Sequence, residues 1–190
     1  MELVREGSAP TDQDLITRHK TGDSGAANAL LARYKDYIFR LCYRYMQNYE
    51  DAMDLMQEVL VRMFRALDRY EERNYLKGWI YRIVANTAIN MKKVNARRAV
   101  PNTDYFETVR DEHADATSPL AVSFLTEMIS RAAQTLSGKQ RDVFFLRYYE
   151  QMSYGEIARA IKISANSAKS NYFYALTKVK AALERAGVHL

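Results

Sequence analysis

Apolar residues recur at three- and four-residue steps along most of this chain, the spacing that places them on one face of an α-helix. Thr11 and the acidic turn after it are typical of a helix start, and Gly22 ends this first helix. Three further helices are predicted in this half, over residues 24–45, 51–67 and 77–98. The predicted buried positions are Leu15, Ile16, Leu30, Leu31, Tyr34, Ile38, Leu41, Cys42, Tyr45, Ala52, Leu55, Met56, Val59, Leu60, Met63, Phe64, Leu67, Trp79, Ile80, Ile83, Val84, Met91 and Val94.

The C-terminal part contains four more helical segments, one over residues 120–136 and others opening at Ser137, Ser153 and Ser164. Ser137 with Gln140, and Ser153 with Glu156, have the spacing of a capping box. A short helix, a tight turn and a longer helix from Ser164 form the pattern of a helix-turn-helix. The predicted inner positions are Val122, Leu125, Met128, Ile129, Ala132, Ala133, Val143, Phe144, Leu146, the stem of Arg147, Ile157, Ala158, Ile161, Ala168, Tyr172, Ala175, Leu176, Val179, Ala182 and Leu183.

Composition narrows the fold class. The 190 residues include 7 glycines and 3 prolines, too few for the turns of an all-β domain, so we expect an all-α fold. A single cysteine excludes an intrachain disulfide and favours a reducing cytoplasm. Three scattered histidines without ligand spacing, and no set of residues suited to nucleophilic catalysis, lead us to expect no metal, no cofactor and no enzymatic activity. No signal peptide or long apolar run occurs, so we expect no insertion into a membrane.

Charge divides the chain into three parts. Residues 1–99 carry 17 basic and 13 acidic side chains, and residues 120–190 carry 10 and 5. Residues 100–119 carry one basic and five acidic side chains and lack an apolar period, with prolines near both ends. We therefore expect two helical domains, 1–99 and 120–190, joined by an irregular acidic linker over 100–119. The linker is either a solvated tether or a functional segment.

The helix over residues 51–67 has an ordered polar face, with acidic and amide side chains in its first half and basic ones in its second. From spacing alone this order is that of an ordinary solvated surface, because it complements the helix dipole. Glu58 and Arg62 also form a common i,i+4 pair. The exposed candidates on this face are Asp54, Gln57, Glu58 and Arg62.

The helix over residues 77–98 has a second stripe that contains no acid: Arg82, Asn86, Asn90, Lys93 and Arg97. Asparagine inside a helix costs roughly 0.5 kcal/mol relative to alanine, so two of them one turn apart require a reason. Their amides can bond base edges, while the neighbouring cations neutralise phosphates. The alternative is a basic face that is merely solvated.

Aromatic residues flank the polar loop that precedes this helix. Tyr70 and Tyr75 enclose Arg73, and Trp79 follows closely. Their rings can stack on unpaired bases beside a basic helix. The alternative is that each ring belongs to the core.

The helix that begins at Ser164 is also basic. From Arg159 to Arg185 there are six basic residues and one acid, Glu184, as expected for a surface that meets a phosphate backbone. In a helix-turn-helix the second helix enters the major groove by its N-terminal residues. The outward residues there are Asn166, Lys169, Ser170 and Phe173.

Three stretches in order resemble the bacterial sigma factors of the extracytoplasmic-function type, the fourth group, which retains only conserved regions 2 and 4. They are residues 51–59 (DAMDLMQEV), 78–88 (GWIYRIVANTA) and 153–158 (SYGEIA). The resemblance implies a region 2 helical bundle followed by a region 4 domain of four helices. It also implies a promoter-recognition subunit without catalysis, with core RNA polymerase, promoter DNA and an anti-sigma factor as partners and no small-molecule substrate.

Roles for the candidate residues follow from this resemblance. The face with Asp54, Gln57, Glu58 and Arg62 would bind the polymerase clamp helices. The minus-ten strand would be melted and read by Tyr70, Arg73, Tyr75, Trp79, Asn86, Asn90, Lys93 and Arg97. The minus-thirty-five duplex would be read by Asn166, Lys169, Ser170 and Phe173, and the linker would run through the polymerase towards its active cleft.

The chain departs from the family pattern at two places. Residues 164–171 (SANSAKSN) lack the usual proline and glycine, and Asn171 stands where an arginine is common, which puts one DNA contact in doubt. Ala27 stands where an aromatic residue is usual. The chief alternative is a stand-alone helix-turn-helix regulator with an N-terminal helical sensing or dimerisation domain. A second alternative, a helical hydrolase or metalloenzyme, would need a nucleophile or a metal-ligand set, and the sequence offers neither.

Overall fold

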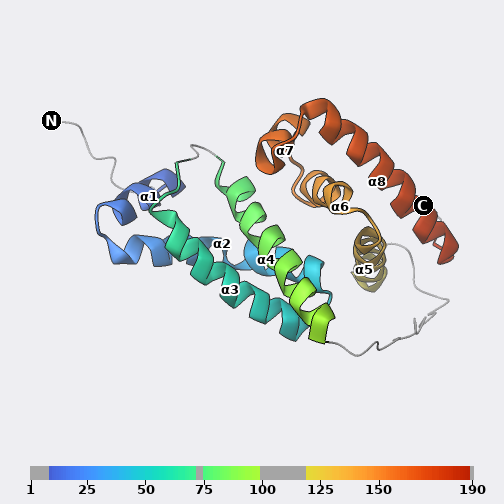
Figure 1. Cartoon of the computed structure of the whole chain (residues 1–190), viewed down its shortest axis with the longest axis horizontal. Coiled ribbons are helices and arrows are strands. Elements are labelled where there is room, and N and C mark those ends of the chain that lie inside the picture. Colours follow the sequence, from blue (N-terminus) through green and yellow to red (C-terminus); the bar gives the residue numbers. More distant parts are fainter. Residues whose placement is uncertain (1–8, 72–74, 99–118, 189–190) are drawn as a thin grey trace. The chain divides into compact units, whose positions relative to one another are not determined.

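The computed structural model describes residues 9–71, 75–98 and 119–188, and among these every regular element is a helix (Figure 1). This confirms the predicted all-α fold. In chain order the elements are α1 (Asp12–Lys20), α2 (Ser24–Met46), α3 (Tyr49–Leu67), α4 (Leu76–Arg98), α5 (Pro119–Gln134), α6 (Gly138–Phe144), the π-helix η1 (Phe145–Tyr149), α7 (Tyr154–Ile161) and α8 (Ala165–Arg185).

The chain divides into two compact units, Met1–Ala88 and Ile89–Leu190, so this division falls within α4 rather than at its end. The acidic linker expected over 100–119 lies outside the described residues except at Pro119. The linker and the boundaries drawn around it therefore stay predictions. Each unit is described by itself below.

Side-chain caps fix the helix starts in the N-terminal unit. Thr11 Oγ1 accepts from the Asp14 N–H, and the Asp14 carboxylate accepts from the Thr11 N–H, a complete capping box. Asp23 caps α2 by accepting from the N–H groups of residues 25 and 26. Asn48 caps α3, which therefore begins at Tyr49, two residues before the predicted start at Asp51.

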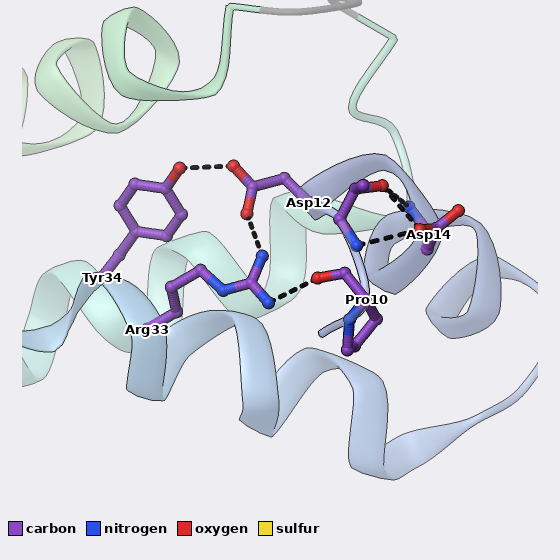
Figure 2. A network of polar contacts seen from close by, with 6 residues as sticks. Pro10, Asp12, Asp14, Arg33 and Tyr34 are labelled. Carbon is purple, nitrogen blue, oxygen red and sulfur yellow. Dashed lines mark hydrogen bonds and ion pairs between the residues drawn. The ribbon is translucent and has the colours of Figure 1, made fainter. Parts of the chain in front are cut away.

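A polar network joins α1 to α2 (Figure 2). Arg33 donates through Nη1 to Asp12 Oδ1 at 2.6 Å and through Nη2 to the Pro10 carbonyl at 2.6 Å. The Tyr34 hydroxyl donates to Asp12 Oδ2, and burial together with this carboxylate raises the pKa of Tyr34. One carboxylate thus bonds two successive side chains of α2, which fixes where α1 lies on it.

Large apolar side chains from α2, α3 and α4 fill the core of this unit. The Tyr45 and Tyr81 hydroxyls are hydrogen-bonded at 2.7 Å, and this buried pair joins α2 to α4. Cys42 is fully buried as predicted, and burial raises the pKa of its thiol to about 12. Phe64 was predicted to be buried but is 46% exposed, at the edge of a stripe that Met63 and Leu67 complete. Val94, in the part of α4 that follows this unit, was also predicted to be buried and is 44% exposed.

In the C-terminal unit α5, α6 and α7 pack on α8. The predicted capping box of α7 is present, with Ser153 and Glu156 each bonded to the other's backbone N–H. The one predicted for α6 is wrong: Ser137 lies at the N-cap, but its side chain makes no cap hydrogen bond within the described chain. Gln140 is engaged elsewhere, because its Oε1 accepts from Lys178 Nζ of α8 at 3.0 Å.

α6 continues directly into the π-helical turn η1, which the apolar pattern did not predict. Phe145 and Leu146 of this turn are buried. Arg147 is half-buried as predicted, and its Nη1 donates to the Met152 carbonyl at 2.8 Å while its guanidinium lies over the Tyr154 ring. Leu176, predicted to face inward, is 40% exposed, because Ala175 and Val179 set the buried face of α8.

Candidate polymerase-binding and DNA-binding surfaces

The polar face of α3 is exposed along its length. Leu55, Val59 and Met63 turn inward, which leaves the four candidates Asp54, Gln57, Glu58 and Arg62 at the surface. Glu58 and Arg62 form the expected ion pair, with Arg62 Nε 2.6 Å from Glu58 Oε1 and both side chains about half exposed. Such an exposed pair adds at most about 1 kcal/mol to stability, so both charges stay available to a partner.

Two apolar side chains on α3 share this polar face, and the sequence analysis did not select them. Val61 is 45% exposed and Phe64 is 46% exposed. Residues three and four apart are neighbours on a helix, so Val61 lies beside Gln57 and Glu58, and Phe64 lies beside Val61. The signal was present in the apolar run over residues 59–64, but the period alone did not show which members face outward.

The acid-free stripe of α4 is presented to solvent. Asn86, Asn90 and Lys93 are exposed and Arg82 is half-buried. On the opposite side Ile80, Val84 and Ala88 are buried, and the Thr87 hydroxyl donates to the Ile83 carbonyl at 2.7 Å. The side chain of Arg97 lies outside the described part of the chain. Two amides and one ammonium group are therefore aligned on one face, without a carboxylate among them.

The aromatic residues before α4 occupy different environments. Tyr70 is 5% exposed, and its ring meets that of Trp79 edge-on at 5.0 Å. Trp79 and Tyr75 are half-buried. Arg73 lies outside the described residues. In this arrangement the buried Tyr70 ring supports the Trp79 ring, and both Trp79 and Tyr75 retain an accessible surface.

The helix-turn-helix consists of α7, a turn and α8. Lys162 ends α7 in the left-handed conformation, with φ 55° and ψ 55°, at the position where glycine is frequent. Ser164 Oγ then caps α8 by accepting from the Ser167 N–H at 3.0 Å. Ala168, Ala175, Val179 and Leu183 are buried, which leaves the four predicted DNA-reading residues exposed: Asn166, Lys169, Ser170 and Phe173.

Asn171 is half-buried and bonds within its own helix. Its Nδ2 donates to the Ser167 carbonyl at 2.8 Å and to Ser167 Oγ at 3.2 Å. The amide is therefore directed along α8 rather than outward. Tyr174, which the sequence analysis did not select, is 58% exposed and meets the exposed Phe173 ring edge-on at 5.9 Å.

Two family models match separate parts of this chain. Residues 30–98 match the family model of sigma-70 region 2, and residues 126–186 match that of sigma-70 region 4. The RNA polymerase sigma-H factor of Pseudomonas aeruginosa is 29% identical over 182 residues, covering 91% of this chain and 94% of the relative. The ECF RNA polymerase sigma-E factor of Escherichia coli K12 is 30% identical over 174 residues, covering 87% and 90%.

Solved structures share the fold. CnrH, solved in complex with the cytosolic domain of CnrY, aligns with a TM-score of 0.67 at 18% identity, covering 92% of this chain and 97% of CnrH. The sigma factor RpoE, solved with the anti-sigma factor NepR from Bartonella quintana, aligns with a TM-score of 0.62 at 17% identity, covering 83% and 96%. Sequence motifs, fold and relatives agree, and the chain belongs to the family of extracytoplasmic-function RNA polymerase sigma factors.

Proposed function

We propose that this chain is the promoter-recognition subunit of a bacterial RNA polymerase, a sigma factor of the fourth group that acts in the cytoplasm. It binds core polymerase through the polar face of α3. It reads the melted minus-ten strand with α4 and the preceding loop, and the minus-thirty-five duplex with the N-terminal part of α8. The chain itself catalyses nothing, since the polymerase forms the phosphodiester bonds.

The exposed stripe of Asn86, Asn90 and Lys93 carries this proposal. Asparagine is a poor helix former, and a solvated face does not need it. Its amide can donate to and accept from the edge of a base, while an ammonium group neutralises a phosphate. Extruding a base costs a few kcal/mol, so amides that bond only the right base select the sequence while they stabilise the open strand.

A protein anti-sigma factor is the second partner that we propose. Two proteins of this fold, CnrH and RpoE, were solved with CnrY and with the anti-sigma factor NepR, respectively. Within the described residues no helix is both long and apolar enough to cross a bilayer.

The test is transcription from a promoter library by purified core polymerase, with and without this chain, followed by Asn86→Ala. The matched control is Asn95→Ala, because Asn95 is also exposed on α4 but lies nine residues on, about half a turn around the helix from Asn86. We expect Asn86→Ala to lower open-complex formation about tenfold, the effect of losing on the order of 1–3 kcal/mol of base recognition. Affinity for core polymerase should stay unchanged.

Two results would overturn the proposal. One is a library without any start site that depends on this chain. The other is tight, sequence-specific binding of duplex DNA by the free chain with no effect of core polymerase, which would identify a stand-alone regulator instead. Equal open-complex formation by the Asn86 and Asn95 variants would remove the amide stripe from the reading surface.

A further inference from the structure

The C-terminal end of α1 contacts the segment that leads from α3 into the loop before α4. Lys20 Nζ donates to the Tyr70 carbonyl at 2.5 Å, across 50 residues of sequence. The neighbouring His19 places its Nε2 3.0 Å from Asp68 Oδ1, and its ring lies 5.7 Å from that of Phe64. Two successive residues of α1 therefore contact the segment 64–70, which comprises the last turn of α3 and the three residues after it.

The start of α1 is held in place as well. The Asp12 carboxylate bonds both Arg33 and Tyr34 of α2, so α1 is fixed at its start as well as at its end (Figure 2). Gln13 and Lys20 of α1 line an open hollow together with Tyr70 and Glu71. Tyr70 and Glu71 thus lie against α1, which α2 holds in position.

The Lys20 contact extends to the start of α4. Lys20 bonds the backbone of Tyr70, and the buried Tyr70 ring packs at 5.0 Å against Trp79, in the first turn of α4. Asn86 lies seven residues beyond Trp79, two turns along and on nearly the same side of the helix. A shift of Tyr70 therefore changes the support of the Trp79 ring, which lies on the same side of α4 as the amide stripe.

We propose that Lys20 is a positioning residue for minus-ten recognition: its bond to the Tyr70 carbonyl holds Tyr70, and through the Tyr70 ring Trp79, in place relative to the amide stripe of α4. The inference rests on the proposed function and adds to it a residue of α1. That helix precedes residues 30–98, which match sigma-70 region 2. A charged donor bonded to a partly buried carbonyl is a strong hydrogen bond, and its loss leaves the acceptor to be satisfied by water.

The experiment compares holoenzymes, formed from core polymerase and the full chain, that carry Lys20→Met, Lys20→Arg or Lys35→Met. Methionine keeps the apolar stem and removes the ammonium group, arginine restores a cationic donor, and Lys35 is an exposed lysine of α2. The probes are two single-stranded oligonucleotides: the minus-ten sequence that the wild-type holoenzyme selects from a promoter library, and a shuffled sequence of the same composition. The quantity measured is the ratio of the two affinities.

We expect Lys20→Met to lower this ratio about tenfold, and Lys20→Arg to restore at least half of the loss on a logarithmic scale. Lys35→Met should leave the ratio unchanged. Loss of positive charge or of folded protein would weaken binding of both oligonucleotides equally, so the ratio separates positioning from either effect. An unchanged ratio for Lys20→Met, or a loss that arginine does not restore, would overturn the role of Lys20. A wild-type holoenzyme without any preference would overturn the proposed function first.

Discussion

Ser164 and Ser137 both occupy helix N-cap positions in the C-terminal unit with similar backbone angles, yet they differ in the hydrogen bonds that their side chains make. Ser164 has φ −77° and ψ 155° and accepts from the Ser167 N–H at 3.0 Å. Ser137 has φ −60° and ψ 154°, and within the described residues its side chain makes no cap bond. The pair offers a matched test of what the cap contributes to the DNA-reading helix, because both changes remove the same hydroxyl.

We expect Ser164→Ala to destabilise the C-terminal unit by about 1 kcal/mol, the usual cost of losing a bonded N-cap serine. Ser137→Ala should cost less than about 0.5 kcal/mol, since no cap bond is lost. For a domain of this size, 1 kcal/mol corresponds to a decrease in melting temperature of roughly 4–8 °C. The first turn of α8 carries Asn166 and Lys169, so the loss of order should also weaken duplex binding.

The measurement is amide hydrogen exchange along α8 in the full chain, with urea unfolding of the same variants. Exchange at Ser167 should accelerate most in Ser164→Ala, because its N–H loses its acceptor, and little in Ser137→Ala. Equal decreases in the free energy of unfolding for the two substitutions would refute the argument. They would mean that the hydrogen bond of Ser164 adds no stability to that of a serine without a cap bond. Unchanged exchange at Ser167 would refute it as well.

Three further predictions follow from the exposed charges. Lysine substitution of both Asp54 and Glu58 should abolish co-purification with core polymerase, and retained co-purification would remove this face from the interface. Lys169→Ala should weaken duplex binding and reduce the slope of log affinity against log salt by about one, which a salt titration measures; an unchanged slope would mean that Lys169 contacts no phosphate. Hydrogen bonds from Ser153 hold the pKa of Glu156 below its usual 4.5. The capping box therefore stabilises the fold above about pH 4.5, and this contribution is lost as the pH falls through the lower folded-state pKa. Urea unfolding of Glu156→Gln between pH 6 and 3 should show a shallower loss of stability than wild type, and equal slopes would contradict the assignment.

Helix starts that depend on a local side chain were predictable from the sequence. Thr11, Ser153 and Ser164 each cap the helix that the sequence assigned to them, because a capping bond spans only three residues and needs no tertiary contact. Two caps were predicted wrongly: the local cap of α3 at Asn48 was not recognised, and for Ser137 the reason is long-range. Its partner Gln140 bonds Lys178, 38 residues away, which no local spacing indicates.

The edges of the buried stripes were not predictable in the same way. Phe64, Val94 and Leu176 follow the helical period, yet each is at least 40% exposed. An apolar stripe covers about 100° or more of a helix, so the period identifies its centre, whereas the packing of neighbouring helices decides its edges. The π-helical turn at Phe145–Tyr149 was missed for a related reason, since an apolar run has the same letters in either helix type.

The exposure of Phe64 bears on how the proposed polymerase-binding surface of α3 works, and α8 carries a comparable exposed apolar pair. Phe64 lies with Val61 beside the charged candidates on α3, and Tyr174 lies with Phe173 on α8. An apolar side chain that stays exposed within its own unit can still bury its surface against a partner, and this burial favours binding. Aromatic and apolar side chains enclosed by polar ones commonly carry most of the energy of an interface, while charges set its orientation and its salt dependence. On α3, therefore, Phe64, which the helical period assigns to the core, is well placed to be buried by polymerase, and on α8 the exposed rings of Phe173 and Tyr174 are well placed to be buried by DNA.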